Sequence, residues 1–154
     1  MRGPVARCKT ASLLVATACV LVGCAGKNDV SPIDAERQAF EDLRNEIREI
    51  IVDPPRETEA IALVDALAED LGTLREKILE RRQRVRQLNA NYDTRRADFE
   101  AFFDQADREI QSNQQRVTMN HRKFLAITTP EEWSALSKAR SGAMNAAMRA
   151  IHTT

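Results

Sequence analysis

The sequence has little of the side-chain chemistry that most enzyme and metal sites need. Its 154 residues include three cysteines, two histidines and only five glycines. His121 and His152 lie far apart in the chain, and no Ser/His/Asp grouping or glycine-rich phosphate loop accompanies them. We therefore expect both histidines to be surface residues, and we expect no enzyme activity, no cofactor and no small-molecule substrate.

The sequence also has no apolar run long enough to span a bilayer as a helix, which takes about 20 residues. The longest such stretch, residues 10–22, is preceded by Arg2, Arg7 and Lys9, and no acidic residue comes before Asp29. A positive segment followed by a short apolar one is typical of a secretory signal peptide. The sequence predicts that residues 1–23 are a removable leader.

The apolar stretch ends in Leu21-Val22-Gly23-Cys24, which resembles the lipobox of bacterial lipoproteins. The resemblance implies cleavage between Gly23 and Cys24 and a diacylglyceryl group on the Cys24 sulfur, with fatty-acyl chains such as palmitate. Two or more acyl chains hold a protein durably on a membrane. Ala25 follows the cysteine in place of the Asp that signals inner-membrane retention in enteric bacteria. We expect a lipid-anchored envelope protein, at the outer membrane and facing the periplasm.

Removal of the leader would leave the mature chain without a free thiol. Cys8 and Cys19 would be lost and Cys24 would carry lipid, which excludes disulfides and cysteine-bound metals. Of the 23 basic and 23 acidic residues only three basic ones belong to the leader, so the mature net charge is −3. This balance predicts neither nucleic-acid binding nor a polybasic membrane patch.

Few prolines interrupt the mature chain, and each marks a helix boundary. Ser31-Pro32 suits an N-cap and first helical residue, and Pro54-Pro55 must end the preceding helix. Thr129-Pro130-Glu131-Glu132 matches a capping box. After a lipidated tether over residues 24–32, we expect one helical domain over 33–152, with helices at about 33–51, 56–127 and 130–151.

Apolar residues recur at helical spacing through all three segments. The first segment has Phe40, Leu43, Ile47 and Ile50, and the third has Trp133, Leu136, Ala143, Met144, Ala147 and Ile151. In the second segment one heptad stripe runs from Ala60 to Phe102 and, after a step of one residue to Phe103, continues to Ile127, which favours one helix about 105 Å long. A turn at residues 89–91 is the alternative, and it would make a compact bundle.

The predicted fold is all-α, an elongated antiparallel hairpin or coiled coil. It has one very long central helix, the first helix along its near end and the third antiparallel along its far end. The two short helices would leave the middle of the long one uncovered, and exposed apolar stripes usually mark interfaces. An antiparallel homodimer or a protein partner would cover it. The expected interaction surface comprises Ile78, Arg81, Arg82, Val85, Leu88, Tyr92, Phe99 and Phe102.

Charge also changes along the chain. Residues 34–71 are mainly acidic, whereas residues 75–96 are mainly basic. The basic part either recognises an anionic envelope partner or is a solvated helix surface stabilised by neighbouring ion pairs.

Two observations favour a different role. Met144, Met148 and His152 recur every four residues, and thioether and imidazole ligands suit cuprous copper, although packing also explains Met144. Residues 127–132 are similar to the Leu-Thr-x-x-Gln motif of periplasmic cradle chaperones and metal-stress sensors, although the Gln is missing. The sequence thus predicts a non-enzymatic structural or adaptor coiled coil, with a chaperone-like or stress-sensing and metal-sensing module as the alternative.

Overall fold

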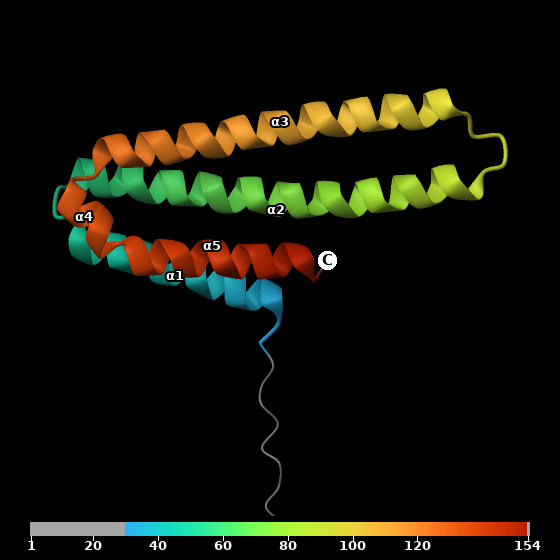
Figure 1. Cartoon of the computed structure of the whole chain (residues 1–154). Coiled ribbons are helices and arrows are strands. Elements are labelled where there is room, and N and C mark those ends of the chain that lie inside the picture. The colour runs from blue at the N-terminus through green and yellow to red at the C-terminus, as the bar shows by residue number, and fades with distance from the viewer. Residues whose placement is uncertain (1–29, 154) are drawn as a thin grey trace, which may run out of the picture.

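The computed structural model describes residues 30–153, so the predicted leader and Cys24 lie outside the described residues. Within this range the chain forms helices only, and the all-α prediction is confirmed. The helices are α1 (Pro32–Ile50), α2 (Pro54–Ala90), α3 (Arg96–Ile127), α4 (Pro130–Ala135) and α5 (Ser137–His152). In Figure 1, α2 and α3 run side by side along the whole molecule, and α1 and α5 form a shorter second layer beneath one end.

The predicted helix boundaries at the prolines are confirmed. The Ser31 hydroxyl accepts a hydrogen bond from the Asp34 N–H at 3.1 Å, and Pro32 is the first residue of α1. The α1 helix ends before Pro54, which opens α2. At α4, the Thr129 hydroxyl accepts from the Glu132 N–H at 3.2 Å and the Glu132 carboxylate accepts from the Thr129 N–H at 2.8 Å. Each boundary follows from local chemistry that the sequence displays directly.

The prediction of a single long helix over 56–127 is wrong, because the chain turns back between Ala90 and Arg96. The Asn91 side chain accepts a hydrogen bond from the Asp93 N–H at 3.1 Å, and the Asn91 carbonyl accepts from the Thr94 N–H at 3.1 Å. The Asp98 carboxylate then caps α3 by accepting from the Arg95 N–H at 2.8 Å. These local hydrogen bonds satisfy backbone groups that a continuous helix would otherwise pair. The turn lies next to residues 89–91, where the alternative prediction placed it.

The α2 and α3 helices therefore form an antiparallel hairpin within one chain. Its seam buries Leu71 and Leu88 from α2 against Ala106, Asn113 and Phe124 from α3. Two polar contacts also cross it: Arg116 pairs with Asp70 at 2.8 Å, and the Asn120 side-chain amide donates to the Leu63 carbonyl at 2.9 Å. The heptad stripe kept its phase across the turn because each helix needs an apolar face for the other.

The third predicted helix is divided and lies elsewhere than expected. The fully buried Leu136 separates α4 from α5, and α5 packs mainly on α1 rather than along the far end of a long helix. The small side chains of Ala143, Ala147 and Ala150 allow this close approach, and α1 supplies large residues that fill the space. The shared core includes Phe40, Leu43, Ile47 and Ile51.

Two ion pairs join the layers where α1 crosses α2. Glu36 of α1 is buried and pairs with Arg75 of α2, and Arg44 pairs with Asp65 at 2.7 Å. Beyond Arg75, α2 and α3 continue past the ends of α1 and α5 (Figure 1). We call this projecting part, residues 79–108, the arm.

Candidate functional site

The predicted interaction surface lies at the base and along the arm, but its aliphatic and phenylalanine members face inward. Leu88 is buried, and Ile78, Val85, Phe99 and Phe102 are half-buried in the hairpin. Arg81 is half-buried, whereas Arg82 and Tyr92 are exposed. The prediction of an uncovered middle was therefore wrong: it assumed that α2 and α3 were one straight helix, and α3 of the same chain supplies the cover.

The arm nevertheless keeps exposed apolar side chains. Tyr92, at the turn, is 104% exposed, and Phe103 and Leu79 are 53% and 46% exposed. Phe102 turns toward α2, and its ring meets that of Phe103 edge-on at 5.2 Å. Successive residues of a helix point about 100° apart, so two adjacent phenylalanines cannot both face α2. This signal is present in the sequence, yet the predicted surface omitted Leu79 and Phe103.

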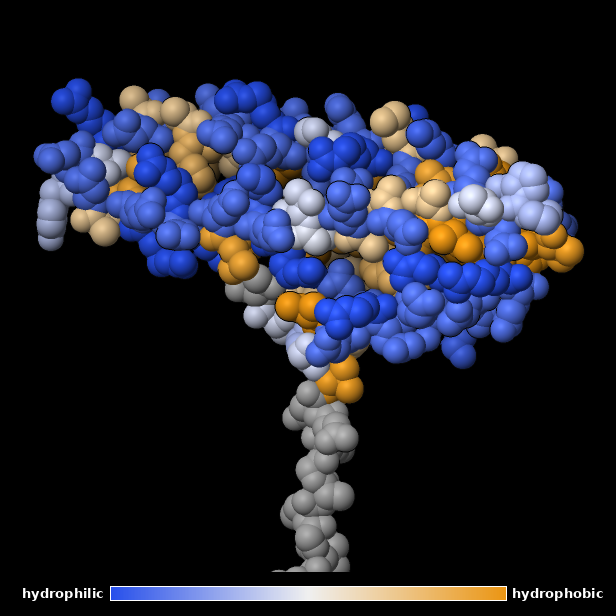
Figure 2. All heavy atoms as spheres, turned by 180° about the vertical axis from the view of Figure 1, so that it is seen from behind, coloured by the Kyte–Doolittle hydropathy of each residue, from blue (hydrophilic) through white to orange (hydrophobic). Residues whose placement is uncertain are grey.

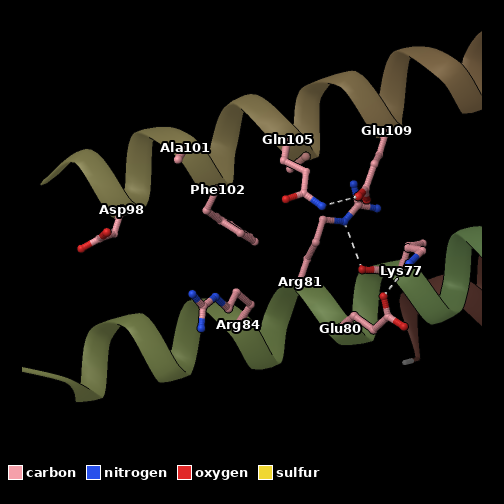
Figure 3. A pocket seen from close by; sticks show the side chains of 10 residues that line it. Lys77, Glu80, Arg81, Arg84, Asp98, Ala101, Phe102, Gln105 and Glu109 are labelled. Carbon is pink, nitrogen blue, oxygen red and sulfur yellow. Dashed lines mark hydrogen bonds and ion pairs between the residues drawn. The ribbon is translucent and has the colours of Figure 1, made fainter. Parts of the chain in front are cut away.

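A pocket of about 430 Å³ opens between the two helices of the arm (Figure 3). Three basic residues and three acidic ones line it: Lys77, Arg81, Arg84, Glu80, Asp98 and Glu109. Lys77 pairs with Glu80 at 2.8 Å, and the Arg81 Nε donates to the Lys77 carbonyl at 3.1 Å, whereas the Arg81 Nη1 is buried without a hydrogen-bond partner among the described residues. The bond to Glu80 raises the pKa of Lys77. The equal numbers of acidic and basic residues give the pocket no net charge that would favour a cationic or an anionic ligand.

The surface seen from behind is mostly hydrophilic, with apolar patches between the helices (Figure 2). Isolated apolar residues are normal on protein surfaces, and a continuous row carries more information. Phe103 and Ile110 of α3 are exposed and Val117 is half-buried, at intervals of seven residues. This row runs along α3 from the arm toward the two-layered end of the molecule.

A bidentate ion pair closes the end of the molecule opposite the turn. Arg56 of α2 donates to both carboxylate oxygens of Glu132, at 2.8 Å and 3.1 Å, and to the Ile127 carbonyl at 3.2 Å. The same Glu132 carboxylate caps α4, so the Arg56 side chain joins α2 to the end of α3 and to α4. The bond to Arg56, with the bond from Thr129 second, lowers the pKa of Glu132 below its ordinary value of 4.5.

We expect this pair to make the fold sensitive to acid. A carboxylate whose pKa is lower in the folded state contributes stability above its unfolded pKa, and the contribution is lost as the pH falls through the folded pKa. Between pH 6 and pH 3, the melting temperature of the wild type should fall more steeply than that of Glu132→Gln, as circular dichroism can measure. Glu131→Gln, an exposed neighbour, should follow the wild type. Equal slopes for wild type and Glu132→Gln would contradict this assignment.

The candidate copper ligands lie along α5 without other metal-binding groups. Met144 is half-buried, Met148 is 43% exposed and His152 is exposed near the end of the helix. Within residues 30–153 no group of three or more His, Cys, Asp or Glu side chains is arranged to hold a metal ion. His121 is exposed, as predicted for both histidines, and its ring meets that of Trp133 edge-on at 5.3 Å.

Comparison with known proteins finds no matching family model, curated protein or solved structure. Across residues 30–153, no helix combines the length and the apolar character needed to cross a bilayer.

Proposed function

We propose that this protein is a lipid-anchored adaptor of the bacterial envelope, without enzyme activity, and that the arm binds a partner protein. The leader and the lipobox ending at Cys24 support the anchor and the envelope location. The absence of Asp directly after Cys24 favours the outer over the inner membrane, and we propose that the protein faces the periplasm there. A second copy of the chain is one possible partner.

The main support for a binding role is that aromatic side chains of the arm are exposed to solvent. Tyr92 stands wholly in solvent at the turn, and Phe103 is more than half exposed on α3. The chain contains only seven aromatic residues, so two exposed on one projection are a large share. Tyrosine is enriched among the residues that dominate binding energy at protein interfaces.

The geometry also separates the arm from the anchor. The seven residues between Cys24 and Pro32 reach at most about 25 Å when fully extended, which limits how far the helices can stand from the bilayer. The α2 part of the arm, residues 79–90, is about 18 Å long at the rise of an α-helix. In Figure 1 the turn lies at the far end of the molecule from α4, and α1 starts between these ends. An anchored body with a projecting arm suits an adaptor.

Site-specific crosslinking in intact cells tests this proposal. A photoreactive amino acid at Leu79 should give a discrete adduct, and the same group at Met148, which is similarly exposed on α5, should not. Tyr92→Ala combined with Phe103→Ser should lower the Leu79 adduct by about fivefold, the effect of losing about 1 kcal/mol of binding energy. An adduct of twice the chain mass identifies a homodimer. Equal adducts at Leu79 and Met148, or no effect of the double substitution, would reject the arm as the binding site.

A chaperone-like role is the second candidate, and the exposed apolar residues of α3 favour it. Phe103, Ile110, Met119 and Leu125 are 53%, 38%, 56% and 41% exposed. A chaperone would hold unfolded clients on this surface and suppress their aggregation in a light-scattering assay. An adaptor would leave client aggregation unchanged, so the assay distinguishes the two roles.

A further inference from the structure

The two-layered end of the molecule contains an apolar cavity that the proposed adaptor role does not use. Among the described helices, α1 packs on α5, α2 packs on α3 and α1 packs on α2, whereas α3 and α5 make hardly any contact. The small residues of α5 that fit α1 do not reach α3. This leaves a cavity of about 430 Å³ whose apolar walls include Leu43, Leu67 and Phe124.

One end of this cavity carries a positive charge that has no counter-ion among residues 30–153. The Arg140 guanidinium lies over the Trp133 ring, with its central carbon 3.2 Å from the ring centre. One of its terminal nitrogens donates to the Trp133 carbonyl at 3.0 Å, but its Nε is buried without a hydrogen-bond partner in the described structure. Burial lowers the pKa of Arg140, and no described carboxylate offsets this effect.

The residues that line the cavity indicate the sign of the charge on its ligand. Of the described side chains around the cavity, none is acidic, although the chain has 23 acidic residues, and Arg140 is the only permanent cation. His121 and Ser141 at the rim add hydrogen-bonding groups. A half-buried guanidinium whose Nε has no hydrogen-bond partner among the described residues favours an anion, and carboxylates and phosphates match its geometry.

We propose that this cavity binds an amphiphilic anion, with its hydrocarbon part between α3 and α5 and its carboxylate or phosphate head on Arg140. The volume lies within the range of small-ligand sites, about 300 to 1,000 Å³. A partner helix is about 10 Å wide and would require α3 and α5 to separate along their length. The two sources of such a ligand in an envelope are free fatty acids and phosphorylated lipid fragments.

Trp133 is the only tryptophan of the chain and lines the cavity, so its fluorescence reports binding directly. The test uses the whole protein as cells make it, mixed with phosphatidylcholine vesicles, which contain no tryptophan. Decanoate and decyl phosphate should change the fluorescence saturably, and the tighter of the two identifies the source. Decyltrimethylammonium, with a chain of equal length and a cationic head, should bind about tenfold more weakly or worse.

Substitution of Arg140 distinguishes the contribution of its charge to binding from the contribution of the apolar cavity. Arg140→Met should lower the affinity for decanoate about tenfold or more and leave the affinity for neutral decanol unchanged. Arg149→Met, at an exposed site on the same helix, should change neither. The proposal is overturned by the absence of a saturable response, by equal binding of the anion and the cation, or by an Arg140→Met variant that loses decanol and decanoate alike.

Discussion

Arg75→Met should lower the free energy of unfolding by about 3 kcal/mol, one of the two largest effects we expect. The substitution keeps most of the side-chain volume but removes the partner of Glu36, whose side chain is only 8% exposed. A buried carboxylate without a partner loses its solvation and gains nothing in return. We place the effect at the low end of the range for broken buried pairs because the Arg75 side chain is still 18% exposed. Urea denaturation followed by circular dichroism measures the change.

A double substitution shows whether the loss comes from the stranded charge. Glu36→Leu combined with Arg75→Met replaces the pair by apolar side chains and should recover stability to within about 1 kcal/mol of the wild type. Arg37→Met serves as the matched control, since Arg37 is 75% exposed and its pair with Asp34 should contribute less than about 0.5 kcal/mol. If the double variant is as unstable as Arg75→Met, packing rather than charge accounts for the loss.

Cys24→Ala should abolish lipid attachment, the second large effect. Labelled palmitate should appear in the wild-type chain and be absent from the variant, because alanine has no sulfur to carry the diacylglyceryl group. The variant should also lose the stable association with membranes that two or more acyl chains provide. Metabolic labelling and cell fractionation measure both results.

The helices should fold without the anchor, since every buried residue of the described core lies between Glu36 and Ile151. The circular dichroism spectrum and melting temperature of the purified variant should match the wild type. Cys8→Ala and Cys19→Ala, within the leader, should leave labelling intact. Labelling that persists in Cys24→Ala would contradict the lipobox assignment.

The helices and their ends follow from the sequence because their causes are local. Pro32, Pro54 and Pro130 fix where helices start, and the stripe from Phe40 to Ile50 fixes the face that α1 buries. The turn after Ala90 was harder to predict. A heptad stripe shows that a helix needs a partner, but it does not show whether the partner is another chain or the same chain folded back. Asn91 and Asp98, whose side chains make the turn, were the local signal that outweighed the phase.

The candidate sites could be predicted only in part, for the same reason. The surface chosen around Ile78 to Phe102 located the arm, but which of its residues face solvent depends on where α3 lies. The cavity beside Arg140 was beyond prediction, since it depends on the packing of α5 against α1 rather than α3. Helical spacing predicts that Trp133 and Met144 pack in a core, and both residues also line this cavity.

The antiparallel packing of α1 and α5 brings the start of the first helix beside the end of the last (Figure 1). A fluorescent protein or epitope tag fused at the C-terminus would therefore stand next to the tether, close to the lipid surface if the chain is anchored as proposed. A fluorescent protein there would collide with the bilayer, and it would report on the tether rather than on the arm. An insertion at the turn, residues 91–95, would avoid both ends of the helical body, but it would displace Tyr92, on which the proposed binding role depends.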